Sequence, residues 1–268
     1  MRKAHFARVL SVSIPFVCLG LLPLATSQPV PNRPIRVEER SGVVQERDVQ
    51  RGRSATVEAV VESYIRFLGG RAAIKGHVSV VEKGHFDIVA GRAKTTIYQK
   101  KPNKYVEMID FPNTERSVMG VDGVVAWNVS PEGQFYKATG EELRQAIREA
   151  DFMESIYKLY PRLSLASQQT VEGHSANVLE TDSTNGYRRR MYFATESGEL
   201  LRIDKENPDG VINIFFYDYR NVDGIKYPFV RREESPVGVV TLHFDEIKTN
   251  VPIKNSFFSA PSSVSQIK

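Results

Sequence analysis

Short segments of strand-like sequence alternate with tight-turn dipeptides through most of the chain, and this pattern limits the fold more than any other feature. Between residues 77 and 247 the segments are rich in β-branched and aromatic residues, and apolar positions alternate with polar ones. The turn signals at their joints are Asp122-Gly123, Asn185-Gly186, Ser197-Gly198, Asp209-Gly210 and Asp223-Gly224. Because Asp-Gly and Asn-Gly favour the primed turns of β-hairpins, neighbouring segments should pair in an antiparallel way. The sequence therefore predicts a mainly β domain with some helix, formed as an antiparallel meander, a barrel or an open half-barrel.

Two segments interrupt this pattern with helical spacing. The first begins at Ser54 or Thr56, either of which can cap a helix, and ends at Gly69-Gly70. Its apolar residues fall on a single face, and they are Val57, Val60, Val61, Tyr64, Ile65 and Leu68. A helix with one apolar stripe packs that stripe against another element, so we expect it to lie on the sheet.

The second helical segment, residues 139–161, lies between two blocks of strands. Thr139 and Glu142 have the spacing of a capping box, and Pro161 ends the segment because proline cannot donate to the preceding turn. Its second half is apolar around much of its circumference, so this helix must cover something or be covered. We predict that it forms a lid over the concave face of the sheet. The expected lid residues are Leu143, Ile147, Phe152, Met153 and Ile156.

The N-terminal region is expected to lie outside the folded domain. Basic residues precede an apolar run that is short for a bilayer span and is broken by prolines, and small residues follow it. This pattern predicts a secretory signal peptide over residues 1–27, with cleavage after Ser27, rather than a membrane anchor. Residues 28–54 are rich in Pro, Arg and Glu without apolar periodicity, which predicts a disordered linker. Residues 55–268 would then form a single domain.

Removal of the signal peptide would change the charge and the cysteine content of the protein. The peptide carries Arg2, Lys3 and Arg8 and no acidic residue, so the formal net charge falls from +4 to +1. It also carries Cys18, the sole cysteine, so the mature chain has neither a disulfide nor a thiol nucleophile. A net charge so close to zero lacks the basic footprint of nucleic-acid-binding proteins. We therefore expect a secreted protein that binds no nucleic acid.

The sequence contains no motif for catalysis or for a cofactor. G-x-S-x-G, P-loop, G-x-G-x-x-G and H-E-x-x-H patterns are all absent. His85 and His243 fall on strands that could meet, but a lone strand histidine is usually structural, so we assign no metal site. Arg188-Arg189-Arg190 follows a turn and is interpreted as a solvated strand end rather than as a docking patch for an acidic partner. The prediction is a protein with no catalytic residue, no metal and no cofactor, which is not an enzyme.

The apolar strand positions are large, and a deeply curved sheet has an inner face that one N-terminal helix cannot cover. The candidate residues for a hydrophobic-ligand cavity are Phe86, Ile88, Ile97, Trp127, Phe193, Ile214, Phe216, Leu242 and Phe244. A domain of this length is also large enough to form a solid core. The pattern fits a hollow interior and an ordinary packed core equally well, and both stay open at this point.

Two groups of motifs follow one another along the chain. The first group is Lys101-Pro102-Asn103-Lys104-Tyr105, the hairpin 117–123 and Ala126-Trp127-Asn128. The second group is the segment 217–228, the segment 250–253 and Phe257-Phe258. Together they resemble the Lol-type periplasmic lipoprotein carriers and the related outer membrane lipoprotein-sorting proteins. The resemblance covers about residues 56–261. It implies an open antiparallel half-barrel of about ten or eleven strands, with an N-terminal helix and a central lid helix on its concave face.

The same resemblance implies a periplasmic binder or carrier of a hydrophobic ligand, either an acyl chain or a lipoprotein, in a lidded β cavity. In the carriers an arginine at the basic-Pro-Asn position holds the lid closed. Here Lys101 stands at that position as the latch candidate, although lysine lacks the planar fork of arginine. The implied partners are a lipid or an acylated protein and membrane-bound donor and acceptor proteins, with the protein itself a monomer. The alternative is a secreted interaction or scaffold domain that fills its cavity with its own side chains and binds no ligand.

Overall fold

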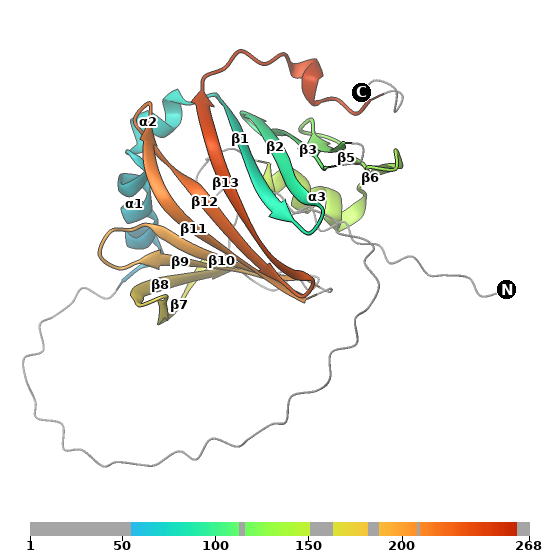
Figure 1. Ribbon diagram of the computed structural model, residues 1–268. Coiled ribbons are helices and arrows are strands. Elements are labelled where there is room, and N and C mark those ends of the chain that lie inside the picture. Colours follow the sequence, from blue (N-terminus) through green and yellow to red (C-terminus); the bar gives the residue numbers. More distant parts are fainter. Residues whose placement is uncertain (1–54, 113–115, 151–162, 182–187, 208–209, 262–268) are drawn as a thin grey trace, which may run out of the picture. The chain divides into compact units, whose positions relative to one another are not determined.

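The computed structural model describes residues 55–112, 116–150, 163–181, 188–207 and 210–261 (Figure 1). The predicted signal peptide and the predicted linker lie outside these ranges. So does the second half of the predicted central helix, with three expected lid residues, Phe152, Met153 and Ile156. Within the described ranges, no helix combines the length and the apolar character that a membrane span requires.

Thirteen antiparallel strands form one open sheet. Their order is β6-β5-β4-β3-β2-β1-β13-β12-β11-β10-β9-β8-β7. The first six strands are β1 (Ser79–Ile88), β2 (Gly91–Lys100), β3 (Lys104–Asp110), β4 (Ser117–Val121), β5 (Ala126–Val129) and β6 (Phe135–Lys137). The other seven are β7 (Leu163–Val171), β8 (His174–Thr181), β9 (Arg188–Ala194), β10 (Leu200–Asn207), β11 (Gly210–Val222), β12 (Ile225–Ser235) and β13 (Gly238–Thr249). The predicted open antiparallel half-barrel is confirmed, with more strands than the ten or eleven expected.

The first and last strands of the chain pair with each other in the middle of the sheet. β1 and β13 align Glu82 with Ile247 and His85 with His243. From this seam one meander runs outward to β6 and the other runs outward to β7. The two edge strands are joined in sequence by the segment that contains α3 (Gly140–Glu149). The central helical segment therefore connects opposite edges of the sheet.

The hairpin turns carry the residues that their backbone requires. Asp223 and Gly224, between β11 and β12, have φ values of 49° and 88°. Both values are positive, as the primed two-residue turn demands. The predicted hairpin at Asp122-Gly123 also forms, but Val121 pairs with Ala126 across a four-residue turn. Asp122 Oδ1 accepts from the amides of Val124 and Val125, each at 2.8 Å, and thereby stabilises the longer turn.

The predicted N-terminal helix is α1 (Val57–Leu68), which is followed by the short helix α2 (Arg71–Gly76). Thr56 caps α1, since its Oγ1 accepts from the Ala59 amide at 3.1 Å. Gly69 ends the helix with φ 125°. Val60, Val61 and Ile65 of α1 form one buried cluster with Leu179, Met191, Phe193 and Leu200 of the sheet. The apolar stripe thus packs on the sheet as the sequence predicts.

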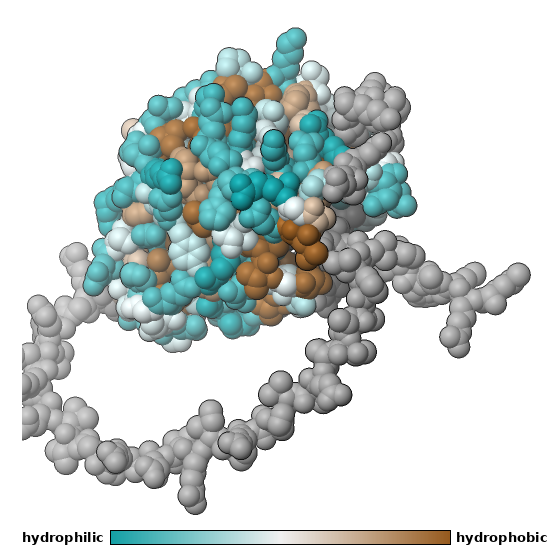
Figure 2. Space-filling view, in the orientation of Figure 1, coloured by the Kyte–Doolittle hydropathy of each residue, from teal (hydrophilic) through white to brown (hydrophobic). Residues whose placement is uncertain are grey.

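The opposite face of the sheet is covered in part by the C-terminal segment. Phe258, in the 3₁₀ turn Asn255–Phe258, is fully buried against Val106, Val118 and Trp127. Figure 1 shows this face toward the viewer, with α1 and α3 behind the strands. Figure 2 shows hydrophobic residues gathered near the end where β1 and β13 turn. The hairpin tips there carry Val89 and Val237, which are 93% and 80% exposed.

Candidate functional site

The pairing register decides which side chains share the concave face, because directly opposed residues of a sheet point to the same side. Glu82 of β1 is opposite Ile97 of β2, and Ile97 is opposite Glu107 of β3. On the other side of the seam, Glu233 of β12 is opposite Ile214 of β11. The register of β13 with β1 and with β12 links the two groups, so all these residues lie on the face against which α1 packs.

Eight of the nine predicted cavity residues lie on this concave face. They are Phe86, Ile88, Ile97, Phe193, Ile214, Phe216, Leu242 and Phe244. Phe193 packs beneath α1 in the cluster described above, and Phe216 borders that cluster. Phe86, Ile97, Leu242 and Phe244 are buried on β1, β2 and β13, where they extend the apolar lining beyond α1.

The ninth residue, Trp127, is on the opposite face, which corrects the sequence interpretation. Trp127 pairs with Gly120, and Gly120 pairs with Val106 of β3. The neighbouring residue on β3, Glu107, is the one that points to the concave face, so Val106 and Trp127 point to the other face. Its Nε1 donates to the carbonyl oxygen of Phe258 at 3.1 Å. A Cβ atom at Gly120 would lie 2.5 Å from the indole, so the glycine makes room for the ring. Trp127 anchors the C-terminal segment and is not part of the concave lining.

Helix α3 buries a polar face rather than the apolar stripe expected from the sequence. Gln145, Ala146 and Glu149 are buried, whereas the expected lid residues Leu143 and Ile147 are half-buried. Thr139 is the N-cap residue, but its side chain makes no capping hydrogen bond. The predicted capping box is therefore absent. Glu142 instead accepts from Tyr136 Oη of β6 at 2.9 Å, which ties the start of α3 to the edge strand.

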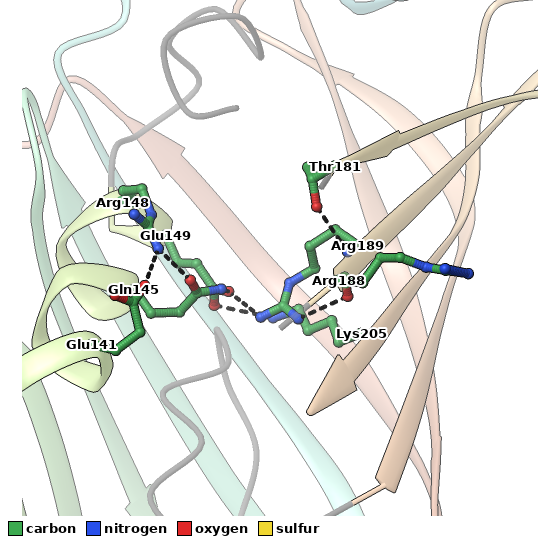
Figure 3. A network of polar contacts seen from close by, with 8 residues as sticks. All are labelled: Glu141, Gln145, Arg148, Glu149, Thr181, Arg188, Arg189 and Lys205. Atoms are coloured by element: carbon green, nitrogen blue, oxygen red, sulfur yellow. Dashed lines mark hydrogen bonds and ion pairs between the residues drawn. The ribbon is translucent and has the colours of Figure 1, made fainter. Parts of the chain in front are cut away.

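A buried ion-pair cluster connects the end of α3 to the far half of the sheet (Figure 3). Arg189 Nη2 of β9 lies 2.5 Å from Glu149 Oε1, and Lys205 Nζ of β10 lies 3.2 Å from Glu149 Oε2. All three side chains are at least 93% buried. Arg189 and Lys205 are direct register partners, so the pairing of β9 with β10 places both cations at one carboxylate. We call Glu149, Arg189 and Lys205 the α3 bridge.

The α3 bridge has strong electrostatic coupling. Burial by itself would raise the pKa of Glu149, but Lys205 and Arg189 outweigh burial and hold the pKa at about 2. Gln145 Nε2 also donates to Glu149 Oε1 at 3.0 Å. Arg148 orients Gln145 by donating to its Oε1 at 2.7 Å. The Glu149 carboxylate is thus ionised, and it is held by Gln145 of its own helix and by the two cations of the sheet.

Two basic residues have contacts that the sequence did not indicate. Lys101 Nζ, just after β2, donates to the Ile74 carbonyl oxygen of α2 at 2.8 Å, and its role as a latch stays a prediction. The interpretation of Arg189 as part of a solvated strand end is wrong, because Arg189 is 4% exposed. Arg189 shares one face of β9 with Met191 and Phe193, because residues two apart on a strand point to the same side. Its place in this row of apolar residues was the sequence signal for its burial.

A second set of ionisable groups occupies the middle of the concave face. Glu107 accepts from Thr95 Oγ1 at 3.0 Å and from Tyr105 Oη at 3.1 Å. Burial raises the pKa of Glu107 to about 7, against the opposing effect of these hydrogen bonds and of Arg231. Burial also raises the pKa of Glu82, which Arg231 partly offsets.

Glu233 and Arg231 on β12 complete this set. Burial raises the pKa of Glu233 to about 8, although Lys205 and Arg231 oppose the change. Arg231 lies over the rings of Phe244 and Phe216, at 5.1 Å and 5.9 Å from the centroids. Both residues occupy the apolar phase of their strand, which the sequence interpretation overlooked for the same reason as Arg189. The concave face is therefore lined by apolar side chains with a charged centre.

The two histidines considered as metal ligands do meet. His85 and His243 are register partners with ring centroids 5.6 Å apart, and His85 Nδ1 lies 2.9 Å from Asp245 Oδ2. They lie on the face opposite Glu82. In the ranges that the structure covers, no group of three or more His, Cys, Asp or Glu side chains could hold a metal ion.

Comparisons with known proteins identify the fold. No protein-family model matches the chain. No curated protein matches it either. Among solved structures, a LolA superfamily protein from Nitrosomonas europaea aligns with a TM-score of 0.53 and 15% identity, over 77% of this chain and 99% of that chain.

Two further structures agree. A DUF1329 family protein from Desulfovibrio piger has a TM-score of 0.51 and 14% identity, over 77% of this chain and 98% of that chain. A putative outer membrane lipoprotein-sorting protein domain from Vibrio parahaemolyticus has a TM-score of 0.50 and 13% identity, over 75% and 95%. The resemblance inferred from the motifs is confirmed at the level of the fold, which this chain shares with LolA-like proteins.

Proposed function

We propose that the protein is a periplasmic binder or carrier of a hydrophobic ligand that bears an acyl chain, bound on the concave face beneath α3. The observation that carries this proposal is the continuation of the apolar lining past α1. Phe86, Ile97, Leu242 and Phe244 follow one another across the seam of the sheet, and helices rather than a second sheet cover this face.

The energy available from such a surface is sufficient for binding. Each methylene of an acyl chain that leaves water contributes about 0.8 kcal/mol. A chain of about twelve carbons would gain on the order of 9 kcal/mol before the cost of ordering it. The fold supports the same proposal, because one structural neighbour is described as a lipoprotein-sorting domain. Signal-peptide removal, action as a monomer and exchange with membrane-bound donor and acceptor proteins belong to this proposal.

The α3 bridge supports a lid that can be held closed. It joins α3, which follows edge strand β6, to β9 and β10 near the other edge. A ligand that enters beneath α3 must either leave these ion pairs intact or replace them. The latch of the lid is then Glu149 with Arg189 and Lys205.

A relocated tryptophan tests the proposal. Trp127 is the sole tryptophan and lies on the wrong face, so the reporter protein carries Trp127→Phe together with Phe244→Trp. The matched control carries Trp127→Phe with Tyr98→Trp, because Tyr98 packs against Phe257 on the opposite face. Addition of a dodecyl amphiphile should shift the emission of the first protein to shorter wavelength and leave the control unchanged. No shift in the first protein, or equal shifts in both, would contradict the proposal and favour a scaffold that fills its own concave face.

A further inference from the structure

The charged centre of the concave face contains polar atoms without partners. Glu233 is 4% exposed, and its Oε2 has no hydrogen-bond partner in the part of the chain that the structure describes. The same holds for Nε of Arg231, which projects from the same face of β12. A buried polar atom left unsatisfied costs about 1–3 kcal/mol. A hydrogen-bond donor that reaches Glu233 from a bound ligand would remove that cost.

The balance of charge on this face indicates the sign of the ligand. Its buried glutamates are Glu82, Glu107, Glu149 and Glu233. Among the described residues they face three cations, Arg189, Lys205 and Arg231, so these groups carry one negative charge in excess when all are ionised. Glu149 already has two cations in contact. The three carboxyl groups around Arg231 therefore carry a local excess of two negative charges when all are ionised.

The carboxyl groups behave as acids that lack sufficient counter-charge. Burial raises the pKa of Glu107 to about 7 and that of Glu233 to about 8, and Arg231 offsets burial only in part. A positive charge placed among them would favour the loss of their protons and would then balance the face. Such a charge would also stabilise both carboxylates.

The apolar side chains beside the carboxyl groups favour an organic cation over a bare metal ion. Among the described residues no three acidic, histidine or cysteine side chains converge closely enough to hold a metal. A primary ammonium group has three donor hydrogens, which can reach separate carboxylates. The apolar residues beside them, Ile97, Leu242 and Phe244, would take the attached chain.

We propose that the concave face selects amphiphiles whose head is a primary ammonium group, bound between Glu107 and Glu233 with the acyl chain along the neighbouring apolar strand positions. This inference rests on the proposed function, because it names the chemical class of the ligand for the same face. Two sources carry this chemistry. One is the head group of an amino-lipid, and the other is the free amine of an acylated peptide.

Calorimetric titration with three dodecyl amphiphiles tests the selectivity at pH 7, below their micelle concentrations. Dodecylamine should bind roughly ten- to hundredfold more tightly than laurate, since one charge-assisted contact contributes about 1.5–3 kcal/mol. Dodecanol should fall between them. Glu107→Gln and Glu233→Gln should each reduce the ratio of amine to acid affinity by about tenfold, whereas Arg231→Gln should increase it. Glu246→Gln is the matched control, because Glu246 contacts Lys83 and Lys248 on the opposite face.

Laurate binding as tightly as dodecylamine to the unaltered protein would overturn the inference and leave the proposed function standing. Binding of none of the three would remove the proposed function as well. Because the unaltered protein decides both outcomes, the test does not depend on the folding of any variant. Lysophosphatidylethanolamine and a peptide with a free N-terminus and a lauroyl amide on a lysine side chain then distinguish the two sources, each compared with its N-acetylated form. Equal binding of both acetylated and free forms would also overturn the inference.

Discussion

Substitution of Glu149 by glutamine should loosen α3 from the far half of the sheet. The change keeps the size of the side chain and removes the charge that Arg189 and Lys205 share. A fall in the pKa of Glu149 from 4.5 to about 2 corresponds to about 3 kcal/mol, because each pKa unit is worth about 1.4 kcal/mol. Removal of one partner from a buried ion pair costs about 3–5 kcal/mol in other proteins, so both routes give the same magnitude.

Urea unfolding at pH 7 measures the total loss, and hydrogen exchange of the α3 amides shows where it occurs. We expect a loss of about 3 kcal/mol with faster exchange in α3. Glu141→Gln is the matched control, since Glu141 pairs with Arg144 and Arg148 near the surface of the same helix. That change should cost about 0.5 kcal/mol or less.

A mutant cycle separates the bridge from a general effect of the substitution. In a background that carries Arg189→Met and Lys205→Met, Glu149 has lost the two cations that offset its burial. Glu149→Gln should then be neutral or stabilising. An equal loss in both backgrounds, or a loss below about 0.5 kcal/mol in the unaltered protein, would refute the reasoning.

Three further predictions concern pH, packing and capping. The folded-state pKa of Glu107 is about 7, so the folded protein holds a proton that the unfolded chain loses near pH 4.5, and stability should fall as pH rises between these values. Glu107→Gln should flatten this limb of a urea-midpoint profile, and an unchanged slope would count against the assignment. Gly120→Ala should cost about 1–3 kcal/mol and perturb the emission of Trp127, since the added Cβ meets the indole. Thr56→Ala should cost about 1 kcal/mol in urea unfolding, and a gain in stability would exclude the N-cap.

The acid limb of the same pH profile has the opposite sign. Glu149 has a folded-state pKa of about 2, so its contribution is fully present above about pH 4.5 and is lost as pH falls toward 2. Glu107 and Glu233 lower the stability as pH rises above about 4.5, so stability should be greatest near pH 5. Glu149→Gln should weaken the loss of stability at low pH and leave the loss above about pH 5 unchanged.

Much of the fold could be predicted from local signals. Thr56 and Gly69 mark the ends of α1, and the Asp223-Gly224 pair marks a hairpin, because each is a short-range backbone requirement. The extra strand β6 was missed because it has only three residues and no alternation to identify it. The pairing of β1 with β13 joins residues far apart in the sequence, and no local pattern specifies it.

The site was less predictable because the sequence shows alternation but not which face is which. Trp127 looked like a lining residue until the register placed it opposite Gly120, beneath the C-terminal segment. Four charged residues lie on the apolar faces of their strands, namely Arg189, Lys205, Arg231 and Glu233. Because they are charged, the sequence analysis either interpreted them as solvated or left them out. Their burial depends on partners from distant strands and from α3, and only the assembled sheet supplies them.

Native mass spectrometry of the protein purified under mild conditions tests the central claim most directly. The account predicts a species heavier than the polypeptide by the mass of one acyl-bearing ligand, which dodecylamine displaces. A Phe244→Asn variant, with its polar side chain on the apolar lining, should retain less of that ligand, and Glu246→Gln should retain the same amount. A protein that carries no ligand and takes up no dodecyl amphiphile would contradict the account.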